Sequence, residues 1–309
     1  MKKIKLSFCI PTYNRSDYLK DTLESIFSQY DENIFSEIEI IISDNCSTDN
    51  TAEIVKKYNK QYPQTIKYNK NETNIGGIKN IIKVTDYAIG EYIWLLADDD
   101  CITNFSIKYI FEIINANDFD ILFCKMQQFE NLPVTIQKYK NNIKKYESFS
   151  DFIDSINKIN FDYTQVISFF SFYSLNIIKN SYFQEIKNKL GKKYEYSYFP
   201  HSYIIFSGNL TKIIVPKNIF ILGRIMNESY NGSIKLIKDL RDIFNLIENN
   251  YKLKKSKSWK KVKKKCLNSW QVNMYIGIIL RKLNLDYKNN KYLIKMYFAY
   301  RKIMKLIFN

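Results

Sequence analysis

The sequence has little of three features that would place a chain of 309 residues in other classes of protein. No apolar run approaches the roughly eighteen residues that a transmembrane helix needs, so we expect a soluble chain. Its five cysteines are scattered without a Cys-X-X-Cys pair, which argues against a disulfide framework and against a zinc site. A single histidine, His201, excludes any metal site built from several histidines.

The amino terminus also lacks the pattern of an export signal. Met1, Lys2 and Lys3 lead directly into the apolar segment Ile4–Ile10, which Pro11 is expected to end. That segment is too short to be the apolar core of a signal peptide with a cleavage site. We therefore expect a cytoplasmic protein, with peripheral attachment to the cytoplasmic face of the inner membrane as a further option.

The net charge of +16 is concentrated at the carboxyl-terminal end of the chain. Residues 251–309 hold 17 lysines and arginines but one acid, Asp286; of the 47 basic and 31 acidic residues, this leaves 30 of each in residues 1–250. A neutral segment followed by a strongly basic one indicates two organisational units.

Short apolar segments alternate with helical patterns through the first hundred residues. The expected strands are Ile4–Ile10, Ile38–Ser43, Ile66–Tyr68 and Tyr92–Leu96. The expected helices begin near Ser16, cover Ala52–Tyr58, and cover Ile78–Ala88 up to Gly90. This alternation predicts an α/β fold with a mostly parallel sheet that is flanked by helices.

Polar clusters follow three of these strands, at the sheet edge where ligands bind in parallel sheets. The clusters are Pro11–Arg15, Asp44–Asp49 and Asp98–Asp100. Three adjacent carboxylates repel one another unless a cation compensates them, and hard oxygen ligands suit Mg²⁺ or Mn²⁺, which also bind phosphate. The acids alone could be a solvated loop, but three clusters at one edge indicate a site.

Four segments, in this order and spacing, give the chain a specific resemblance. They are Ser7–Arg15, Ile41–Asp49, Asn74–Gly77 with the downstream Asn80, and Gly90–Asp100. Together they resemble the family 2 glycosyltransferases of the GT-A fold, and within that family the abequosyltransferase-like enzymes that build bacterial surface polysaccharides. The resemblance covers about a third of the chain.

The resemblance implies a nucleotide pocket built from the first two clusters. Its expected residues are Pro11, Thr12, Tyr13, Asn14, Asp44 and Asn45. Tyr13 offers an aromatic face on which a base could stack, although a strand-ending turn with a packed tyrosine is the alternative. Asp44 matches the position that accepts a hydrogen bond from the base. Its alternative role is an Asx turn or a helix cap, which Asp49 fills more naturally.

The same resemblance implies roles for three further residues near the donor phosphates. Lys79 stands where a basic residue approaches the diphosphate, or it is a solvated helix lysine. Asp98 and Asp100 form the family's D-x-D motif. Asp100 is implied to coordinate Mg²⁺ or Mn²⁺, and Asp98 to contact the ribose or to reach the metal through water.

The reaction also needs a base to deprotonate the acceptor hydroxyl. Many relatives place a pair of acids about a hundred residues after the D-x-D motif, but here Glu195–Tyr203 contains no such pair. His201 stands near the expected position, and an imidazole that titrates near neutrality can accept this proton. The alternative is a buried histidine of the core, with Glu195 as the second candidate base.

Three other segments complete the sheet domain in this interpretation. Gln165–Phe172 is rich in aromatic and β-branched residues and is expected to form a strand and an acceptor wall, or plain core. Lys212–Pro216 is expected to be a further strand. Arg224–Gly232 is expected to be a polar loop that closes over the donor.

The basic region predicts amphipathic helices. Lys252–Lys265 is rich in lysine with Trp259, Cys266 and Trp270 nearby, and Trp270–Leu283 and Tyr292–Phe308 have apolar faces. Basic helices with interfacial aromatics favour an anionic membrane surface, which suits an acceptor carried on a polyprenyl diphosphate. Nucleic acid is the rival polyanion but no nucleic-acid module is visible, and helices packed on the enzyme are the structural alternative.

The sequence therefore predicts a GT-A glycosyltransferase domain over residues 1–232, with a nucleotide-binding half of about 1–104 and an acceptor half of about 105–232. Residues 233–309 are expected to form a basic helical region. The predicted activity is inverting, metal-dependent transfer of a sugar from a nucleoside-diphosphate sugar to a glycan hydroxyl. The rivals are a catalytically inactive sugar- or lipid-binding protein on the same fold, and a nucleotidyltransferase, which should show a Gly-rich basic motif after the first strand.

Overall fold

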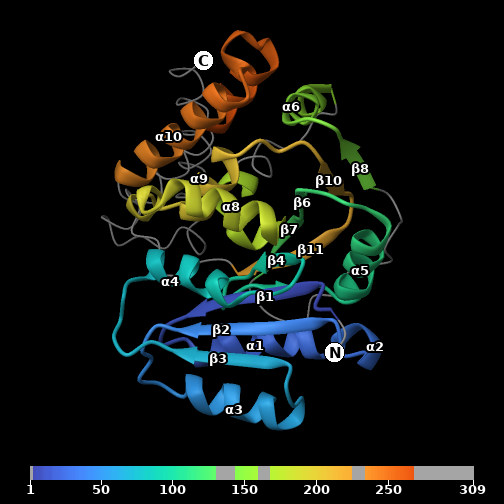
Figure 1. Cartoon of the computed structure of the whole chain (residues 1–309), viewed down its shortest axis with the longest axis vertical. Helices are drawn as coiled ribbons and strands as arrows, with labels where there is room; N and C mark the ends of the chain where they lie inside the picture. Colours follow the sequence, from blue (N-terminus) through green and yellow to red (C-terminus); the bar gives the residue numbers. More distant parts are fainter. Residues whose placement is uncertain (1–2, 130–142, 159–167, 225–233, 268–309) are drawn as a thin grey trace, which may run out of the picture.

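A computed structural model describes residues 3–129, 143–158, 168–224 and 234–267 of the chain. Its main sheet has eight strands in the order β3-β2-β1-β4-β9-β6-β10-β8, and a smaller sheet has the order β5-β11-β7. Figure 1 shows the first three strands and helix α3 at one end of the molecule and helix α10 at the other. The predicted α/β fold with a mainly parallel sheet is confirmed.

The first half of the sheet is parallel and follows the predicted alternation. Its strands are β1 (Leu6–Thr12), β2 (Ile38–Asp44), β3 (Ile66–Lys70) and β4 (Tyr92–Leu95). The intervening helices are α1 (Ser16–Phe27), α2 (Glu32–Phe35), α3 (Thr51–Gln61), α4 (Gly77–Lys83) and the 3₁₀ turn η1 (Val84–Tyr87). Right-handed crossovers place α1 and α3 on one face of the sheet. After β3 the chain crosses back over the sheet and adds β4 on the other side of β1, parallel to it, and this crossover places α4 on the opposite face.

Pro11 does not end the first strand, which corrects one expectation. β1 continues to Thr12, and Pro11 and Thr12 pair with Ser43 and Asp44 of β2. The pairing of β1 with β4 ends at Cys9 and Leu95, so no β4 residue lies opposite Pro11. A proline, which has no N–H to donate, is therefore tolerated here at the end of an interior strand.

The second half of the sheet is mixed rather than parallel. The elements after β4 are β5 (Cys101–Ile102), α5 (Ser106–Ala116), β6 (Ile121–Phe123), β7 (Lys125–Phe129), β8 (Ile143–Tyr146), α6 (Phe149–Lys158), η2 (Tyr173–Leu175), β9 (Asn176–Lys179), α8 (Asn180–Leu190), η3 (Lys193–Tyr196), α9 (Pro200–Ser207), β10 (Ile213–Pro216) and β11 (Ile219–Arg224). Of these strands, β6, β8, β9 and β10 complete the main sheet, whereas β5, β7 and β11 form the smaller one. β9 lies antiparallel between β4 and β6. The predicted strand at 212–216 is confirmed as β10.

The segment expected as a strand at 165–172 is different in its described part. Residues 168–171 are helical, and Phe169 and Phe170 are fully buried there. A run of aromatic residues fits a buried helical turn as well as a strand, so its composition could not decide between them. Residues 165–167 lie outside the described ranges, as does the predicted closing loop after Arg224.

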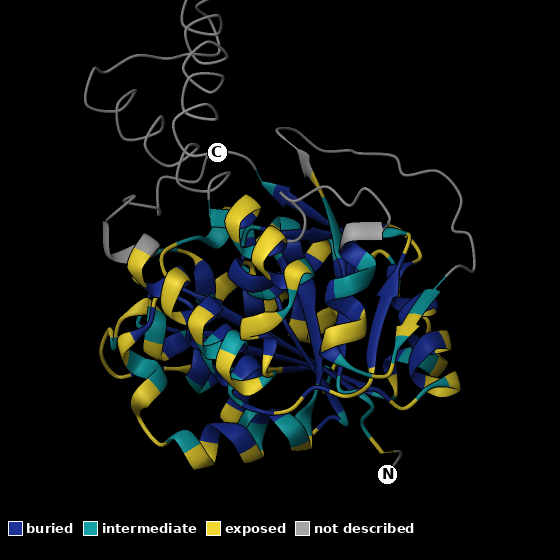
Figure 2. Cartoon of the chain, turned by 90° about the horizontal axis from the view of Figure 1, so that it is seen from above, coloured by how far each residue is buried: buried dark blue, intermediate teal, exposed yellow. Residues whose placement is uncertain are grey.

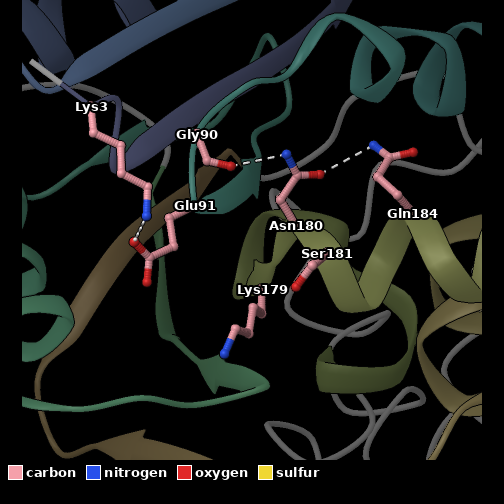
Figure 3. Close-up of a pocket in the computed structure, with 7 residues that line it drawn as sticks. All are labelled: Lys3, Gly90, Glu91, Lys179, Asn180, Ser181 and Gln184. Carbon is pink, nitrogen blue, oxygen red and sulfur yellow. Dashed lines mark hydrogen bonds and ion pairs between the residues drawn. The ribbon is translucent and has the colours of Figure 1, made fainter.

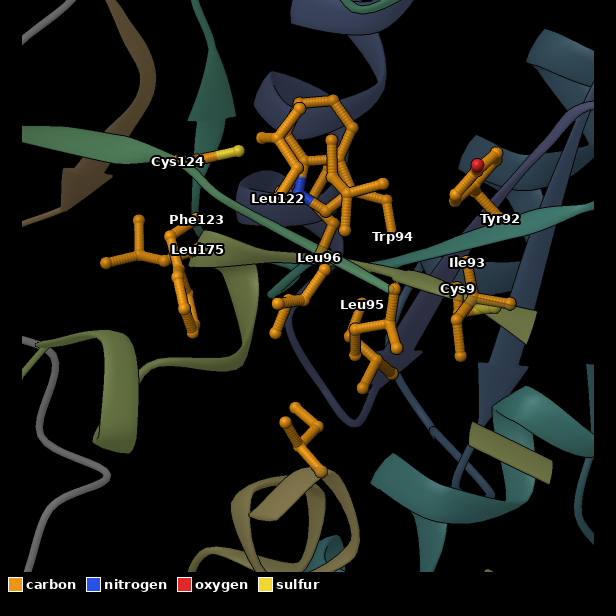
Figure 4. Packing of buried hydrophobic residues seen from close by; sticks show 14 of the residues in the cluster. Cys9, Tyr92, Ile93, Trp94, Leu95, Leu96, Leu122, Phe123, Cys124 and Leu175 are labelled. Atoms are coloured by element: carbon orange, nitrogen blue, oxygen red, sulfur yellow. The ribbon is translucent and has the colours of Figure 1, made fainter. Parts of the chain in front are cut away.

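The centre of the core is the strand that leads into the acids. Figure 4 shows Tyr92, Ile93, Trp94 and Leu95 of β4 packed among side chains of neighbouring strands. The ring of Trp94 stacks on Phe8 at 5.1 Å, and its Nε1 donates a hydrogen bond to the Ser174 carbonyl at 2.8 Å. This packing fixes the end of β4, and with it the position of the residues that follow.

The basic region begins with helices that pack on the rest of the protein. α10 (Ile234–Asn250) packs against α9, and the turn η4 (Leu253–Lys255) leads to a helix over residues 257–267. On that helix Trp259, Val262 and Cys266 are fully buried. Trp259 is therefore a core residue and not the interfacial aromatic that was expected. Figure 2 shows the general pattern, with buried strands inside and exposed residues on the outer helix faces.

The predicted helices at 270–283 and 292–308 lie outside the described residues. Within the part that the structure describes, no helix combines the length and apolar character needed to cross a membrane. The proposed domain boundaries stay predictions.

Candidate active site

The three predicted polar clusters meet at the carboxyl ends of the parallel strands. Direct hydrogen bonds join the first two clusters: the Asn14 amide donates to Ser47 Oγ at 2.8 Å, and Asn14 Oδ1 accepts from the Thr48 amide at 2.8 Å. Asp49 Oδ2 accepts from the Ser16 amide at 2.8 Å and so caps helix α1 from the second cluster. The two loops therefore form one structure.

The acidic triplet joins this edge through helix α1. Thr22 Oγ1 lies 2.9 Å from the backbone carbonyls of both Asp98 and Asp100. The Ala97 amide donates to Ser174 Oγ at 3.0 Å on the other side. The backbone of the segment is thus held from two sides. The Asp100 carboxylate is itself hydrogen-bonded by Ser174 and by the backbone of Arg224.

Arg15 forms ion pairs with two residues of the triplet. Arg15 Nη1 lies 3.0 Å from Asp98 Oδ1 and 3.4 Å from Asp99 Oδ2. Although burial opposes it, the charges of Asp98 and Asp99 raise the pKa of Arg15. Asp100 makes no ion pair of this kind with any described residue.

Burial raises the pKa of all three carboxylates of the triplet. Burial, reinforced by the charge of Asp99, raises the pKa of Asp98 to about 6. Burial and the charge of Asp99 likewise raise the pKa of Asp100 to about 7. A raised carboxyl pKa means that the ionised form is under-compensated, and a bound cation would relieve this.

The carboxylates of the acidic triplet are suited to coordinate a divalent cation that also coordinates oxygen atoms of a bound ligand. Within the described ranges, no set of three or more His, Cys, Asp or Glu side chains is placed to hold a metal ion. Mg²⁺ and Mn²⁺ need fewer, because they keep water and phosphate ligands alongside one or two carboxylates. Asp98 and Asp100, buried and under-compensated, are suited to that limited role.

Asp44 lies at the end of β2, fully buried. Its Oδ1 accepts from the Ser47 amide at 2.8 Å, and its Oδ2 accepts from the Tyr68 hydroxyl at 2.5 Å. It thus closes the turn after β2 through an amide three residues on, one residue further than in the Asx turn that is its alternative role. A carboxylate has further lone pairs, so these bonds do not preclude a ligand.

A network of asparagines supports the second cluster, and sequence reasoning had assigned most of it no role. Asn71 Nδ2 donates to the side-chain oxygens of Asn45 and Asn80, at 3.2 and 3.0 Å. Asn45 Nδ2 donates to Asn74 Oδ1 at 2.7 Å, while Asn80 pairs with Ser43. The network ties the ends of β2 and β3 to the turn before α4. In the structure Asn71 directly follows β3, but the strand expected from the sequence ends at Tyr68, so no direct signal in the sequence indicated its role.

The remaining predicted donor residues differ in exposure. Pro11 and Thr12 are buried on β1, whereas the Tyr13 side chain is 43% exposed and free to meet a flat ligand. Lys79 is exposed on the first turns of α4.

The two candidate bases lie in different environments. His201 on α9 is 1% exposed, and neither ring nitrogen has a hydrogen-bond partner among the described residues. Burial lowers the pKa of His201 to about 3. Its ring lies 5.6 Å from that of Tyr173. Glu195 in η3 is partly exposed.

Arg224 was expected only as the start of a loop, but it lies close to the acids. Its Nη2 pairs with Asp21 at 2.6 Å, and its guanidinium lies 4.9 Å from the ring centre of Tyr18. Burial raises the pKa of Asp99, and the charge of Arg224, like that of Arg15, opposes this rise. The pairing of β11 with β5 brings it there. No local sequence signal indicated this, because the contact depends on the second sheet.

A separate pocket of about 450 Å³ lies at the opposite edge of the sheet. Figure 3 shows its lining, with Lys3 paired to Glu91 and Asn180 bonded to Gly90 and Gln184. Gly90 and Glu91 precede β4, whereas the acids follow it. This pocket is therefore not part of the candidate site.

Two solved structures that share this architecture show which fold it is. Staphylococcus aureus TarS in complex with UDP-GlcNAc aligns over 80% of this chain and 67% of its own, with a TM-score of 0.58 at 21% identity. The mannosyltransferase PcManGT from Pyrobaculum calidifontis, in complex with GDP-Man and Mn²⁺, aligns over 99% of this chain and 87% of its own, with a TM-score of 0.52 at 12% identity. The architecture is the GT-A fold of these transferases.

Residues 7–181, more than half of the chain, match the model of glycosyl transferase family 2, and the chain belongs to that family. Abequosyltransferase RfbV of Salmonella typhimurium is 37% identical over 123 residues, which cover 40% of this chain and 36% of that protein. Poly(ribitol-phosphate) beta-N-acetylglucosaminyltransferase TarS of Staphylococcus aureus is 33% identical over 125 residues, 40% of this chain and 21% of that protein. The alignments thus span a minor part of both relatives. The predicted resemblance to family 2 and to an abequosyltransferase is confirmed.

Proposed function

We propose that the chain transfers a sugar from a nucleoside-diphosphate sugar to a hydroxyl of a bacterial surface glycan, with inversion at the sugar carbon. The observation that carries this proposal is the meeting of Asp98 and Asp100 with the first two clusters at one sheet edge. The names of the relatives support it, since RfbV and TarS are sugar transferases and TarS is solved with UDP-GlcNAc.

In this proposal the chain's residues divide the work at the donor. Tyr13 stacks on the base, Asp44 and the loops around Asn14 and Asn45 shape its pocket, and Lys79 approaches the diphosphate. Asp98 and Asp100 would hold Mg²⁺ or Mn²⁺, whose charge stabilises the departing diphosphate. A base on the acceptor side removes the proton of the attacking hydroxyl. Glu195 is the better candidate, because a partly exposed carboxylate can reach an acceptor, whereas His201 is buried and only weakly basic.

The test is a thermal-shift panel of UDP, GDP, CDP and dTDP, each with and without Mn²⁺. A ligand that binds only the folded state raises the melting temperature. We expect one nucleotide to stabilise the protein only with metal, and Asp100→Ala to abolish the effect. Stabilisation by none of them at saturating concentrations would contradict the proposal. Turnover with the matching nucleotide sugar then separates an enzyme from an inactive binding protein.

We also propose that the basic region binds anionic lipid and brings the enzyme to an acceptor carried on a polyprenyl diphosphate at the cytoplasmic membrane face. The support is a row of exposed lysines on the helix over residues 257–267, opposite its buried face: Lys257, Lys260, Lys261, Lys264 and Lys265. Because Trp259 is buried on the other side, this helix can offer charge but little apolar surface. Binding through it should therefore fall steeply with salt.

Co-sedimentation with vesicles tests this second proposal. The triple variant Lys257→Glu, Lys260→Glu, Lys261→Glu should lose more than about tenfold in binding to phosphatidylglycerol vesicles, at about 1 kcal/mol per lysine. The matched control reverses three exposed lysines of α3, namely Lys56, Lys57 and Lys60. Equal losses in both variants, or binding to nucleic acid in place of vesicles, would refute the lipid surface.

A further inference from the structure

Helix α1 presents one face to the acidic segment. Arg15, Tyr18, Thr22 and Ser25 follow one another at helical spacing. Arg15 and Thr22 contact the segment, Tyr18 contacts Arg224 beside it, and Ser25 Oγ accepts from the amide of Ile102, which follows it. Three of these contacts hold backbone or neighbouring groups. Arg15 alone among the four places a charged group on the carboxylates.

The position of Arg15 relative to Asp98 is asymmetric. The Arg15 side chain is 25% exposed, whereas that of Asp98 is 5% exposed. The guanidinium is therefore the more accessible partner, and it occupies a carboxylate oxygen of Asp98 that the D-x-D motif would offer to a ligand. The nearby Arg224 is held by Asp21 and Tyr18 instead.

A divalent cation and the Arg15 guanidinium compete for the same negative charge. If both lay against Asp98 they would repel each other, since two positive groups would share one buried carboxylate. A diphosphate changes this balance, because its oxygens can accept hydrogen bonds from a guanidinium and can also ligate the cation.

We propose that Arg15 is a positioning residue that makes divalent-cation binding conditional on the donor diphosphate. In the free protein it holds Asp98 and Asp99; when the diphosphate arrives, Arg15 transfers to phosphate oxygens and Asp98 becomes available. Metal and nucleotide then raise each other's affinity by the same factor. This inference rests on the proposed function, since it assumes that a nucleoside diphosphate binds at this edge.

The experiment measures Mn²⁺ binding by electron paramagnetic resonance, with and without saturating UDP or whichever nucleoside diphosphate stabilises the protein. For the wild type we expect UDP to tighten Mn²⁺ binding at least about tenfold. In Arg15→Gln, Mn²⁺ alone should bind at least about fivefold tighter, and the coupling factor should fall toward one. Arg15→Lys keeps the positive charge but lacks the planar guanidinium with its paired N–H donors, so it should retain part of the coupling between Mn²⁺ and UDP binding.

Lys20→Gln is the matched control, because it removes one positive charge from an exposed side chain of α1, the helix that Arg15 precedes. It should behave as the wild type does. Unchanged coupling in Arg15→Gln, with Mn²⁺ alone bound no tighter, overturns the role of Arg15 but leaves the proposed function intact. If no nucleotide and metal pair binds even the wild type, the proposed function fails as well. Melting curves without ligand show that each variant is folded.

Discussion

The amide of Gly90 donates a hydrogen bond to Ser7 Oγ at 2.9 Å, and the two backbones approach so closely there that only glycine fits. A Cβ at position 90 would lie 2.5 Å from Ser7 Oγ and 2.8 Å from the Ser7 amide nitrogen. Gly90 was expected to end a helix, but the last helical turn before it, η1, already ends at Tyr87. Its role is to let the chain enter β4 directly beside β1.

Gly90→Ala should therefore destabilise the protein by about 1–3 kcal/mol, because backbone atoms must move to admit a methyl group. Urea denaturation measures this. Gly77→Ala is the control: a Cβ there meets nothing within 4 Å, and alanine at the start of α4 should be neutral or slightly stabilising. Similar losses in both variants would mean that the close approach to Ser7 is not the cause.

Asp100→Asn should change the dependence of stability on pH. Because the pKa of Asp100 is raised to about 7 in the folded protein, its protonated form favours folding. That contribution is complete below about pH 4, where the unfolded carboxyl is also protonated, and is lost as pH rises through about 7. In the absence of metal, Asn should thus raise the melting temperature relative to wild type at pH 8 but not at pH 4. A difference that does not vary with pH would contradict the raised pKa.

Thr22→Val should loosen the acidic segment while keeping the shape of the side chain. It removes the hydroxyl near the carbonyls of Asp98 and Asp100 in a buried position, at a cost of about 1–3 kcal/mol. We also expect weaker stabilisation by nucleotide with Mn²⁺ in thermal-shift measurements. Thr22→Ser keeps the hydroxyl, and its free energy of unfolding should stay near that of the wild type. If Thr22→Ser is destabilised as much as Thr22→Val, the loss comes from packing and not from the hydrogen bonds.

Glu195→Gln should lower kcat by about a hundredfold or more, with little change in the affinity for the nucleotide, if Glu195 deprotonates the acceptor. His201→Leu should keep or increase the free energy of unfolding, because it removes two buried ring nitrogens without partners in the described structure. Steady-state kinetics and urea denaturation of both variants decide between the two residues. A loss of kcat in His201→Leu, with Glu195→Gln fully active, would assign the base to His201.

The first half of the fold could be predicted because its information is local. Three of the four strands before residue 96, β1, β2 and β4, are short and mostly apolar segments, and the helices between the strands repeat at 3.6 residues. The convergence of Asn14, Asp44 and Asp98 at one edge then follows from parallel pairing alone.

What could not be predicted depends on contacts between distant residues. The partners of Asp98 were open until α1 was placed beside it, so Arg15 stood in a recognised motif without a role. The burial of His201 depends on Tyr173 and Phe199, which surround it only in the folded protein. The helical turn at 168–171 has the composition of a strand, and tertiary packing decides its form.

The place of β9 in the sheet has a consequence for synthesis of the chain on the ribosome. β1 to β4 pair with one another within residues 6–95, but the other edge of β4 pairs with β9, Asn176–Lys179. At about 5–20 residues per second, the roughly 80 residues between them take several seconds to emerge. During that interval Ile93 and Trp94 lie on an open strand edge that can pair with other nascent chains. Slow translation of this interval should favour aggregation, and binding by a chaperone at β4 should suppress it.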